Sequence, residues 1–258
     1  MEYNEYRLSD GAILKSYIRE DLSERCDSYK ERPGIIVLPG GGYSRLSPRE
    51  SEPVVLEFLS RGYNLFLLEY AVTKEEIIKR EPEREAAEAI TFIRRNSEKF
   101  RIKSDNIALM GFSAGGHVAL SLGCHWEKYG AIAKPDALVL SYPVVTMGKW
   151  CHKGSKDNLT RGEEERVEYY SLENQVTSSI PPTFIWHTAE DKSVPPMNTI
   201  MLVEALEEVG AYYEYHIYSK GRHGLSTCRK EVGSEEKRAE KWMETASSWL
   251  CDLFSFAM

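Results

Sequence analysis

The chain has 258 residues, of which 42% are hydrophobic, and this suits one domain with a substantial core. Its 33 basic and 40 acidic residues give a net charge of −7 without a basic stripe, which argues against nucleic acid or an anionic membrane surface as a partner. No apolar run approaches the length of a membrane span, and the first residues lack the pattern of a secretion signal. We therefore expect a single cytoplasmic domain over residues 1–258.

The five cysteines are odd in number and form no close pairs, which is typical of free thiols in a reducing compartment. They are Cys26, Cys124, Cys151, Cys228 and Cys251. Two of them precede a histidine, but neither pair has the spacing of a structural zinc site. The sequence thus predicts neither disulfides nor a bound metal.

The first half of the chain has the pattern of a mixed sheet. Residues up to about Asp21 alternate polar and apolar side chains, which predicts one or two antiparallel strands at a sheet edge. The parallel part begins with the apolar run 34–38, followed by a helix over 53–61 and a second buried strand over 63–69. These three segments make a β-α-β unit.

Three later segments have helical periodicity. Residues 84–95 and 201–209 each place apolar side chains on one stripe, as crossover helices do. The last helix is expected to open at Ser234, with Glu235 and Glu236 in its first turn, and to bury its apolar side against the sheet. No internal repeats are evident.

A serine between small residues marks the most informative turn. Residues 106–110 suit a buried strand, residues 114–122 suit a helix, and Ser113 lies between them within Gly-x-Ser-x-Gly. Gly111 and Gly115 let strand and helix approach closely around a strained serine. Ser113 is therefore the candidate nucleophile.

A carboxylate follows a later strand. Residues 181–187 are rich in β-forming side chains and lead into a loop that carries Glu190 and Asp191. Both are acidic and adjacent, and we favour Asp191 as the candidate acid because it stands just before the Val-Pro turn.

A histidine follows the next strand. Residues 213–218 alternate like a half-exposed strand and lead to His223, which is flanked by glycine-rich loop sequence. The chain order of Ser113, Asp191 and His223 is the order in which parallel strands would bring a nucleophile, an acid and a base to one sheet edge. His223 is therefore the candidate base.

Two other histidines are interpreted as structural. His117 lies one helical turn after the serine and is expected to pack or hydrogen-bond beneath the site. His187 is expected to end its strand without a chemical role.

A triple glycine follows the run 34–38 and is interpreted as an oxyanion-hole loop. Gly41 or Gly42 would supply one backbone N–H donor, and Ala114, at the start of the helix after the serine, would supply the other. A phosphate-binding loop is the alternative, but neither nucleotide-binding motif follows the glycines.

Residues 146–179 are polar, charged and aromatic without clear periodicity, and we interpret them as a cap or lid over the site. Four aromatic side chains are candidates for contact with a substrate, with packing of the cap onto the body as the alternative for those within it. They are Tyr43, Trp150, Tyr169 and Tyr170.

Six short motifs together resemble the bacterial acetyl-xylan-esterase-like (BD-FAE-type) α/β-hydrolases. They are P-G-G-G-Y, G-F-S-A-G-G-H, S-Y-P-V-V, S-L-E-N-Q-V-T, H-T-A-E-D and G-R-H-G-L. The match runs from about Pro33 to the final helix, and Pro39 stands where many related lipases have a histidine. The resemblance implies an α/β-hydrolase fold, with a mostly parallel sheet between helices on both faces, and a Ser113, His223 and Asp191 triad.

The leading functional hypothesis is a serine carboxylesterase that acts through an acyl-enzyme on small acyl esters, with acetylated sugars or xylo-oligosaccharides implied by the resemblance. Such chemistry needs no metal and no organic cofactor. One alternative is an amide hydrolase, either an arylformamidase or a prolyl-oligopeptidase-like peptidase, although the chain has no propeller-forming repeat. Another is a non-catalytic binding protein, a class that usually lacks a triad member. A homodimer is allowed but not required.

Overall fold

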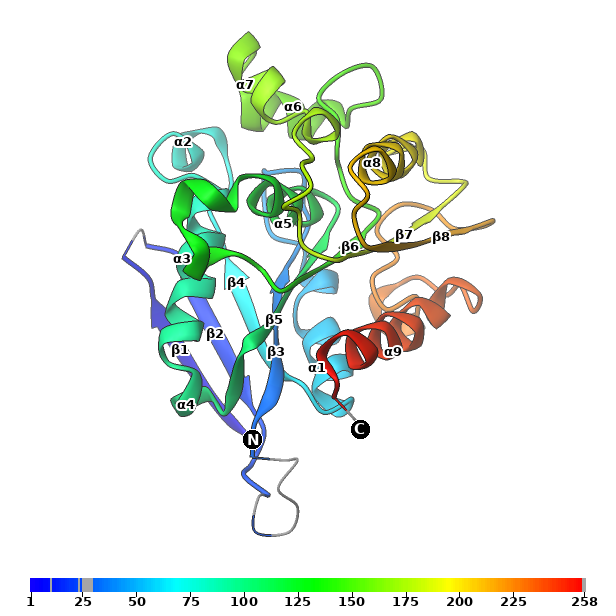
Figure 1. The fold of residues 1–258 in the computed structure, drawn as a ribbon. Helices are drawn as coiled ribbons and strands as arrows, with labels where there is room; N and C mark the ends of the chain where they lie inside the picture. The colour runs from blue at the N-terminus through cyan, green and yellow to red at the C-terminus, as the bar shows by residue number, and fades with distance from the viewer. Residues whose placement is uncertain (10, 23, 25–29, 257–258) are drawn as a thin grey trace.

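The computed structural model describes residues 1–9, 11–22, 24 and 30–256. One sheet of eight strands runs through this part of the chain in the order β1-β2-β4-β3-β5-β6-β7-β8 (Figure 1). The strands are β1 (Glu2–Arg7), β2 (Ile13–Ile18), β3 (Arg32–Leu38), β4 (Asn64–Glu69), β5 (Ile102–Phe112), β6 (Ala137–Ser141), β7 (Thr183–Thr188) and β8 (Tyr213–Tyr218).

The sheet is antiparallel at one edge and parallel elsewhere. β1 pairs with β2 and β2 pairs with β4 in antiparallel register, whereas β3 to β8 all run in one direction. The predicted antiparallel edge before residue 21 is therefore confirmed.

Burial along the strands explains their sequences. β4 is buried over almost its whole length and reads as a continuous apolar run, because helices cover both faces of the parallel sheet. β8 lies at the other edge, where half-buried and exposed positions interleave, and its sequence alternates accordingly.

Helices form a layer on each face of the sheet (Figure 1). One core contains side chains from α3 (Pro82–Arg95), α5 (Ala114–His125) and α8 (Met197–Glu208). The other contains side chains from α1 (Glu52–Ser60) and α9 (Trp242–Phe254). The predicted mostly parallel sheet with helices on both faces is confirmed.

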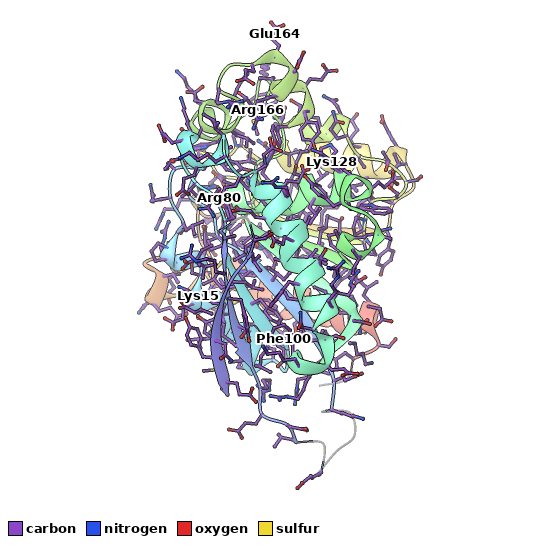
Figure 2. All side chains as sticks on the ribbon, turned by 90° about the vertical axis from the view of Figure 1, so that its left-hand side faces the viewer. Lys15, Arg80, Phe100, Lys128, Glu164 and Arg166 are labelled. Atoms are coloured by element: carbon purple, nitrogen blue, oxygen red, sulfur yellow. The ribbon has the colours of Figure 1, made fainter. Side chains whose placement is uncertain are left out.

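The segment 146–179 contains two short helices, α6 (Lys153–Thr160) and α7 (Glu164–Tyr169), and a 3-10 turn, η5 (Leu172–Asn174). Asn158 in α6 donates a hydrogen bond of 2.9 Å to the carbonyl of Gly42 in the glycine loop. Arg166 in α7 forms an ion pair of 3.0 Å with Glu81. Figure 2 shows Glu164 at the outer end of this segment, far from the sheet.

Short helical pieces complete the part of the chain that is described. Two of these are α-helical, α2 (Lys74–Ile77) and α4 (Ser97–Phe100). Among the described residues outside the segment 146–179, the 3-10 turns are η2 (Pro48–Glu50), η3 (Trp126–Tyr129), η4 (Ala131–Ala133), η6 (Lys230–Val232) and η7 (Ala239–Lys241).

The last helix begins later than the sequence predicts. α9 begins at Trp242; residues 234–236 have no regular secondary structure, and residues 237–238 form a turn. Arg222 donates a hydrogen bond of 2.6 Å to the Ser234 hydroxyl, and the Glu236 N–H donates one of 3.0 Å to the Cys228 carbonyl. These contacts hold the segment against the loop that carries His223, so the predicted cap at Ser234 is wrong.

Cys124, Cys151, Cys228 and Cys251 are free thiols, and Cys26 lies outside the described residues. None of the helices in the described ranges is both long enough and apolar enough to cross a membrane.

A substitution at Trp242 tests the packing of the core formed with α1 and α9. The Trp242 indole is fully buried, stacks on Trp186 with ring centroids 5.1 Å apart, and donates a hydrogen bond of 3.0 Å to the Ser226 carbonyl. Trp242→Ala should lower the free energy of unfolding by about 3–5 kcal/mol, because it leaves a cavity and an unpaired carbonyl. Urea denaturation measures this loss. Trp150→Ala, at a side chain that is 37% exposed, is the control and should change stability by less than about 1 kcal/mol; equal losses would contradict the prediction.

Candidate active site

Ser113 occupies a strained turn between β5 and α5. Its φ of 53° and ψ of −116° are rare for a residue with a side chain, as the sequence predicts for a nucleophile turn. The turn needs glycine nearby, since a Cβ on Gly115 would lie 2.0 Å from the Leu38 carbonyl oxygen. The backbone thus presents the serine at the carboxyl edge of the sheet.

Three loops bring a hydroxyl, an imidazole and a carboxylate into one hydrogen-bonded chain. His223 Nε2 lies 2.8 Å from Ser113 Oγ, and His223 Nδ1 lies 2.6 Å from Asp191 Oδ2. A proton on Nδ1, held by the carboxylate, leaves Nε2 free to accept the serine proton. This arrangement can turn the serine into a nucleophile.

Asp191 is held in place from two sides. Its Oδ1 accepts hydrogen bonds from the backbone N–H groups of Ser193, at 2.9 Å, and Val194, at 3.0 Å. Its Oδ2 faces both His223 and, at 3.3 Å, His187 Nε2. Burial raises the pKa of Asp191, but the hydrogen bonds from His187, His223 and the Val194 backbone outweigh it, so the pKa lies well below its usual range.

Glu190, the competing acid, points elsewhere. Its side chain is exposed, and Oε2 accepts a hydrogen bond of 3.1 Å from the Gly221 N–H. Within the described residues, Asp191 is the one of the two adjacent acids that contacts His223. The structure therefore brings Ser113, Asp191 and His223 together and leaves Glu190 outside the group.

The two histidines interpreted as structural are both fully buried. His187 bonds to Thr199 Oγ1 at 2.8 Å and to the Val194 carbonyl at 2.9 Å, so it braces the loop that carries Asp191. His117 bonds to Tyr43 Oη at 2.7 Å and to the Tyr170 carbonyl at 3.0 Å. Burial lowers the pKa of His117 to about 4, which keeps it neutral near pH 7.

A cavity of about 250 Å³ opens beside the serine. None of its lining residues has an apolar side chain. They are Gly41, Gly42, Ser44, Arg45, Ser47, Arg49, Glu50, Ser113, His152, Gly154, Asn158, Ser193, His223 and Gly224. Short, polar substrates fit such a lining better than long hydrocarbon chains.

Two of the three predicted oxyanion donors line this cavity, and the third, Ala114, directly follows Ser113 in the chain. Gly41 and Gly42 line it beside Ser113, and the φ of Gly41 is +131°, a value that favours glycine. Ala114 is the first residue of α5, where backbone N–H groups have no partner within the helix. The N–H groups of Gly41, Gly42 and Ala114 make no hydrogen bond to the part of the chain that is described. They are therefore available to a negatively charged oxygen.

The four aromatic candidates do not line the cavity. Tyr43 is 1% exposed and bonded to His117, and Tyr170 is 3% exposed. Tyr169 stacks on His125 with ring centroids 4.1 Å apart and donates a hydrogen bond of 2.9 Å to Glu83. Trp150 is partly exposed but is not among the lining residues. The three tyrosines therefore pack against the protein itself, and the geometry does not support the expected contact with a substrate.

The sequence analysis missed most of the polar lining. Arg49 and Glu50 lie seven and eight residues after Gly42, and Asn158 and Ser193 lie in the segment 146–179 and in the loop that carries Asp191. His152, discounted as a zinc ligand, also lines the cavity, and burial lowers its pKa. Arg49 and Glu50 follow the same strand as the glycines, but nothing in the local sequence predicts that Glu50 is buried.

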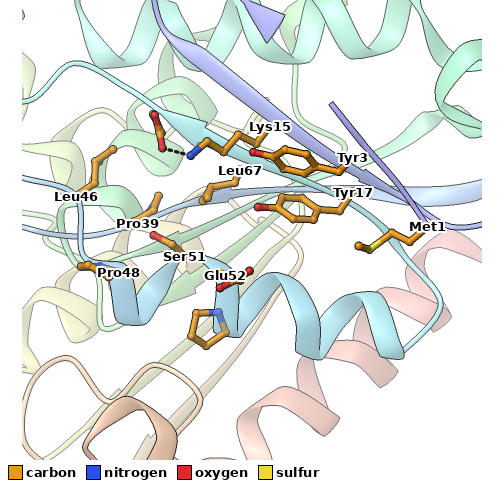
Figure 3. A pocket seen from close by; sticks show the side chains of 12 residues that line it. Met1, Tyr3, Lys15, Tyr17, Pro39, Leu46, Pro48, Ser51, Glu52 and Leu67 are labelled. Carbon is orange, nitrogen blue, oxygen red and sulfur yellow. Dashed lines mark hydrogen bonds and ion pairs between the residues drawn. The ribbon is translucent and has the colours of Figure 1, made fainter. Parts of the chain in front are cut away.

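A larger cavity, of about 770 Å³, is lined by Pro39, Leu46 and Pro48 from the segment that follows β3 (Figure 3). Tyr3, Tyr17 and Lys15 also line it, and Lys15 forms an ion pair of 2.5 Å with Glu69 on the neighbouring strand. None of Ser113, Asp191 or His223 lines this cavity. Size alone therefore does not select the candidate site, because the smaller cavity is the one that Ser113 and His223 line.

The fold and the site define a class: an α/β-hydrolase with a serine at the turn after a central parallel strand. The chain belongs to the BD-FAE family, whose model matches residues 21–206. The resemblance seen in the motifs and the predicted fold class are thereby confirmed.

Two curated relatives match most of this chain. The endo-1,4-beta-xylanase B of Butyrivibrio fibrisolvens is 35% identical, over 94% of this chain and 39% of the relative. The acetylxylan esterase of Xylanibacter ruminicola is 27% identical, over 84% of this chain and 45% of the relative. The chain thus spans less than half the length of these two curated relatives.

A solved structure gives the same result for the fold. The acetyl ester-xyloside bifunctional hydrolase of Caldicellulosiruptor lactoaceticus superposes with a TM-score of 0.84 at 34% identity. The superposition covers 96% of this chain and 90% of that one.

The pKa of Asp191 predicts a pH dependence of stability. Because the folded pKa lies below the ordinary value of 3.8, Asp191 stabilises the fold above that value and loses this contribution as the pH falls through the folded pKa. The free energy of unfolding of the wild type should therefore exceed that of Asp191→Asn by at least about 1 kcal/mol at pH 7, and the gap should shrink below about pH 4. Urea denaturation from pH 3 to 7 measures it.

Glu190→Gln is the matched control for this experiment. It removes the neighbouring charge, which is exposed, so its difference from the wild type should stay small and vary little with pH. The prediction would be contradicted if the difference in free energy of unfolding between the wild type and Asp191→Asn did not change with pH. It would also be contradicted if that difference changed more with pH for Glu190→Gln.

Proposed function

We propose that the chain is a serine carboxylesterase that hydrolyses short acyl esters of polar alcohols. Ser113 is the nucleophile, His223 the general base and acid, and Asp191 the group that orients the imidazole. The observation that carries the proposal is the hydrogen-bonded chain from Ser113 Oγ through His223 to Asp191, beside a polar cavity.

In the acylation half, His223 Nε2 takes the proton of Ser113 as Oγ attacks the ester carbonyl. The carbonyl oxygen gains negative charge and receives hydrogen bonds from the N–H groups of Ala114 and of Gly41 or Gly42. The tetrahedral intermediate then collapses, the carbon–oxygen bond to the alcohol breaks, and His223 returns the proton to the departing alcohol.

In the deacylation half, water takes the place of the alcohol. His223 removes a proton from it as its oxygen attacks the acyl-serine carbonyl. When the second intermediate collapses, the bond to Ser113 Oγ breaks and His223 gives its proton back to the serine. The products are the free acid and the enzyme in its starting state. Asp191 stabilises the imidazolium in both halves without accepting its proton.

The polar lining and the relatives support acetylated sugars as the substrate class. A cavity of about 250 Å³ lies just below the range of roughly 300–1,000 Å³ usual for drug-sized ligands, so a small acyl group and one sugar unit suit it best. Acetylxylan esterase and acetyl ester-xyloside hydrolase are names of relatives. We therefore assign acetylated xylo-oligosaccharides as the leading substrates, with residues 146–179 as a cap that supplies His152 and Asn158.

Ser113→Ala tests the nucleophile. The variant lacks the attacking oxygen, so kcat/KM for p-nitrophenyl acetate should fall by about 10⁴-fold or more. Spectrophotometric release of p-nitrophenol measures this, and circular dichroism checks that the fold is intact. A folded variant that retains near-wild-type turnover would refute the role of Ser113.

The dependence of the rate on acyl-chain length tests the proposed substrate class. The absence of apolar side chains from the lining predicts that kcat/KM is highest for acetyl esters and falls by about tenfold or more by octanoyl, because the longer chain finds no apolar side chain to cover it. A series of p-nitrophenyl esters from acetyl to octanoyl, followed by acetate release from acetylated xylo-oligosaccharides, measures this. A maximum at octanoyl would exclude the deacetylase, and turnover of N-formylated arylamines without ester turnover would favour the amide hydrolase.

A further inference from the structure

Glu50 is a buried carboxylate at the centre of the site that the proposed cycle does not use. It ends the turn η2 and is 3% exposed. Its two oxygens face different loops. Oε2 accepts a hydrogen bond of 2.9 Å from the Gly40 N–H, and Oε1 accepts one of 2.7 Å from the Tyr142 hydroxyl. Glu50 therefore joins the glycine loop to the residue that follows β6.

The Tyr142 side of this link leads to His223. The Tyr142 hydroxyl accepts a hydrogen bond of 2.9 Å from the Ser226 N–H, three residues beyond the histidine. The ring of Tyr142 also meets the imidazole of His223 edge to face, with centroids 5.0 Å apart and an interplanar angle of 72°. Tyr142 is 1% exposed and has a φ of 37°, so its own position is tightly determined.

The Gly40 side leads to the oxyanion donors. Gly40 immediately precedes Gly41 and Gly42, and its carbonyl accepts a hydrogen bond of 2.9 Å from the Ser47 N–H. Because its N–H donates to Glu50, both the N–H and the carbonyl of Gly40 are hydrogen-bonded. A displacement of about 1 Å at a reacting centre can reduce a rate by about 10²-fold, so anchoring this residue matters for the donors that follow it.

We propose that Glu50 is a positioning residue that fixes the oxyanion loop and the His223 ring in one geometry. The proposal rests on the proposed esterase function. Both partners of Glu50 are donors, so the position requires two acceptor oxygens, which a carboxylate has and an amide lacks. Glutamine would leave either the Gly40 N–H or the Tyr142 hydroxyl facing an NH₂ group.

Three variants test this role: Glu50→Gln, Tyr142→Phe and the double variant. For p-nitrophenyl acetate, Glu50→Gln should lower kcat by about 10- to 100-fold with KM within about threefold of the wild type, because the reacting groups are misplaced while the cavity keeps a polar side chain of the same size at residue 50. Tyr142→Phe should give a smaller fall in kcat, since the Gly40 contact survives. The double variant should resemble Glu50→Gln, because both changes break the same link.

Glu52→Gln is the matched control. Glu52 is exposed, stands two residues along the chain and lines the other cavity, so the same change of charge should leave kcat unaffected. Thermal unfolding checks that each variant is folded. If Glu50→Gln does not fold, Tyr142→Phe, which removes one hydroxyl, decides the matter through its own fall in kcat.

The outcomes separate this inference from the proposed function. An active wild type, an inactive Ser113→Ala and an unchanged kcat in folded Glu50→Gln would overturn the role of Glu50 and leave the esterase standing. A rise in KM with unchanged kcat would do the same, since it would make Glu50 a binding group. A wild type that hydrolyses no acyl ester would overturn both.

Discussion

The alignment of parallel strands at one edge of the sheet is the constraint on which the site depends. Gly111 pairs with Leu38 of the neighbouring strand, Phe112 pairs with Ser141, and Thr188 pairs with Tyr218. The loops that follow these strands therefore start at nearly the same height, with spacing set by backbone hydrogen bonds. A shift of one residue in any pair would turn that strand's side chains to the opposite face, so the burial of both faces also protects the site.

This constraint explains why so much was predictable from the sequence. Continuous apolar runs identify the buried parallel strands, and a residue just after such a run must lie at the carboxyl edge. On this basis the sequence alone predicts Ser113 as the candidate nucleophile and His223 as the candidate base. Choosing between Glu190 and Asp191 depended on the turn, where the Ser193 N–H on Oδ1 directs the other oxygen of Asp191 to the imidazole.

The errors have a common physical origin, which is competition from distant parts of the chain. Ser234 has the sequence of a helix cap, yet its hydroxyl accepts a hydrogen bond from Arg222, and the helix begins at Trp242. Tyr169 has the side chain of a sugar-stacking residue, yet it packs on His125. Local pattern describes what a residue can do, whereas tertiary contacts decide which of these options is used.

The two buried acids at the site illustrate the same difference. Asp191 holds His223 directly through Nδ1, while Glu50 reaches the imidazole through the Tyr142 ring. Asp191 could be found because it follows a strand in the expected order, but nothing in the local sequence marks Glu50 as buried. Its environment is built by Gly40 and Tyr142, each following a different strand. A carboxylate that joins loops in this way makes the geometry of the glycine loop dependent on that of the histidine, and such a dependence is visible only in three dimensions.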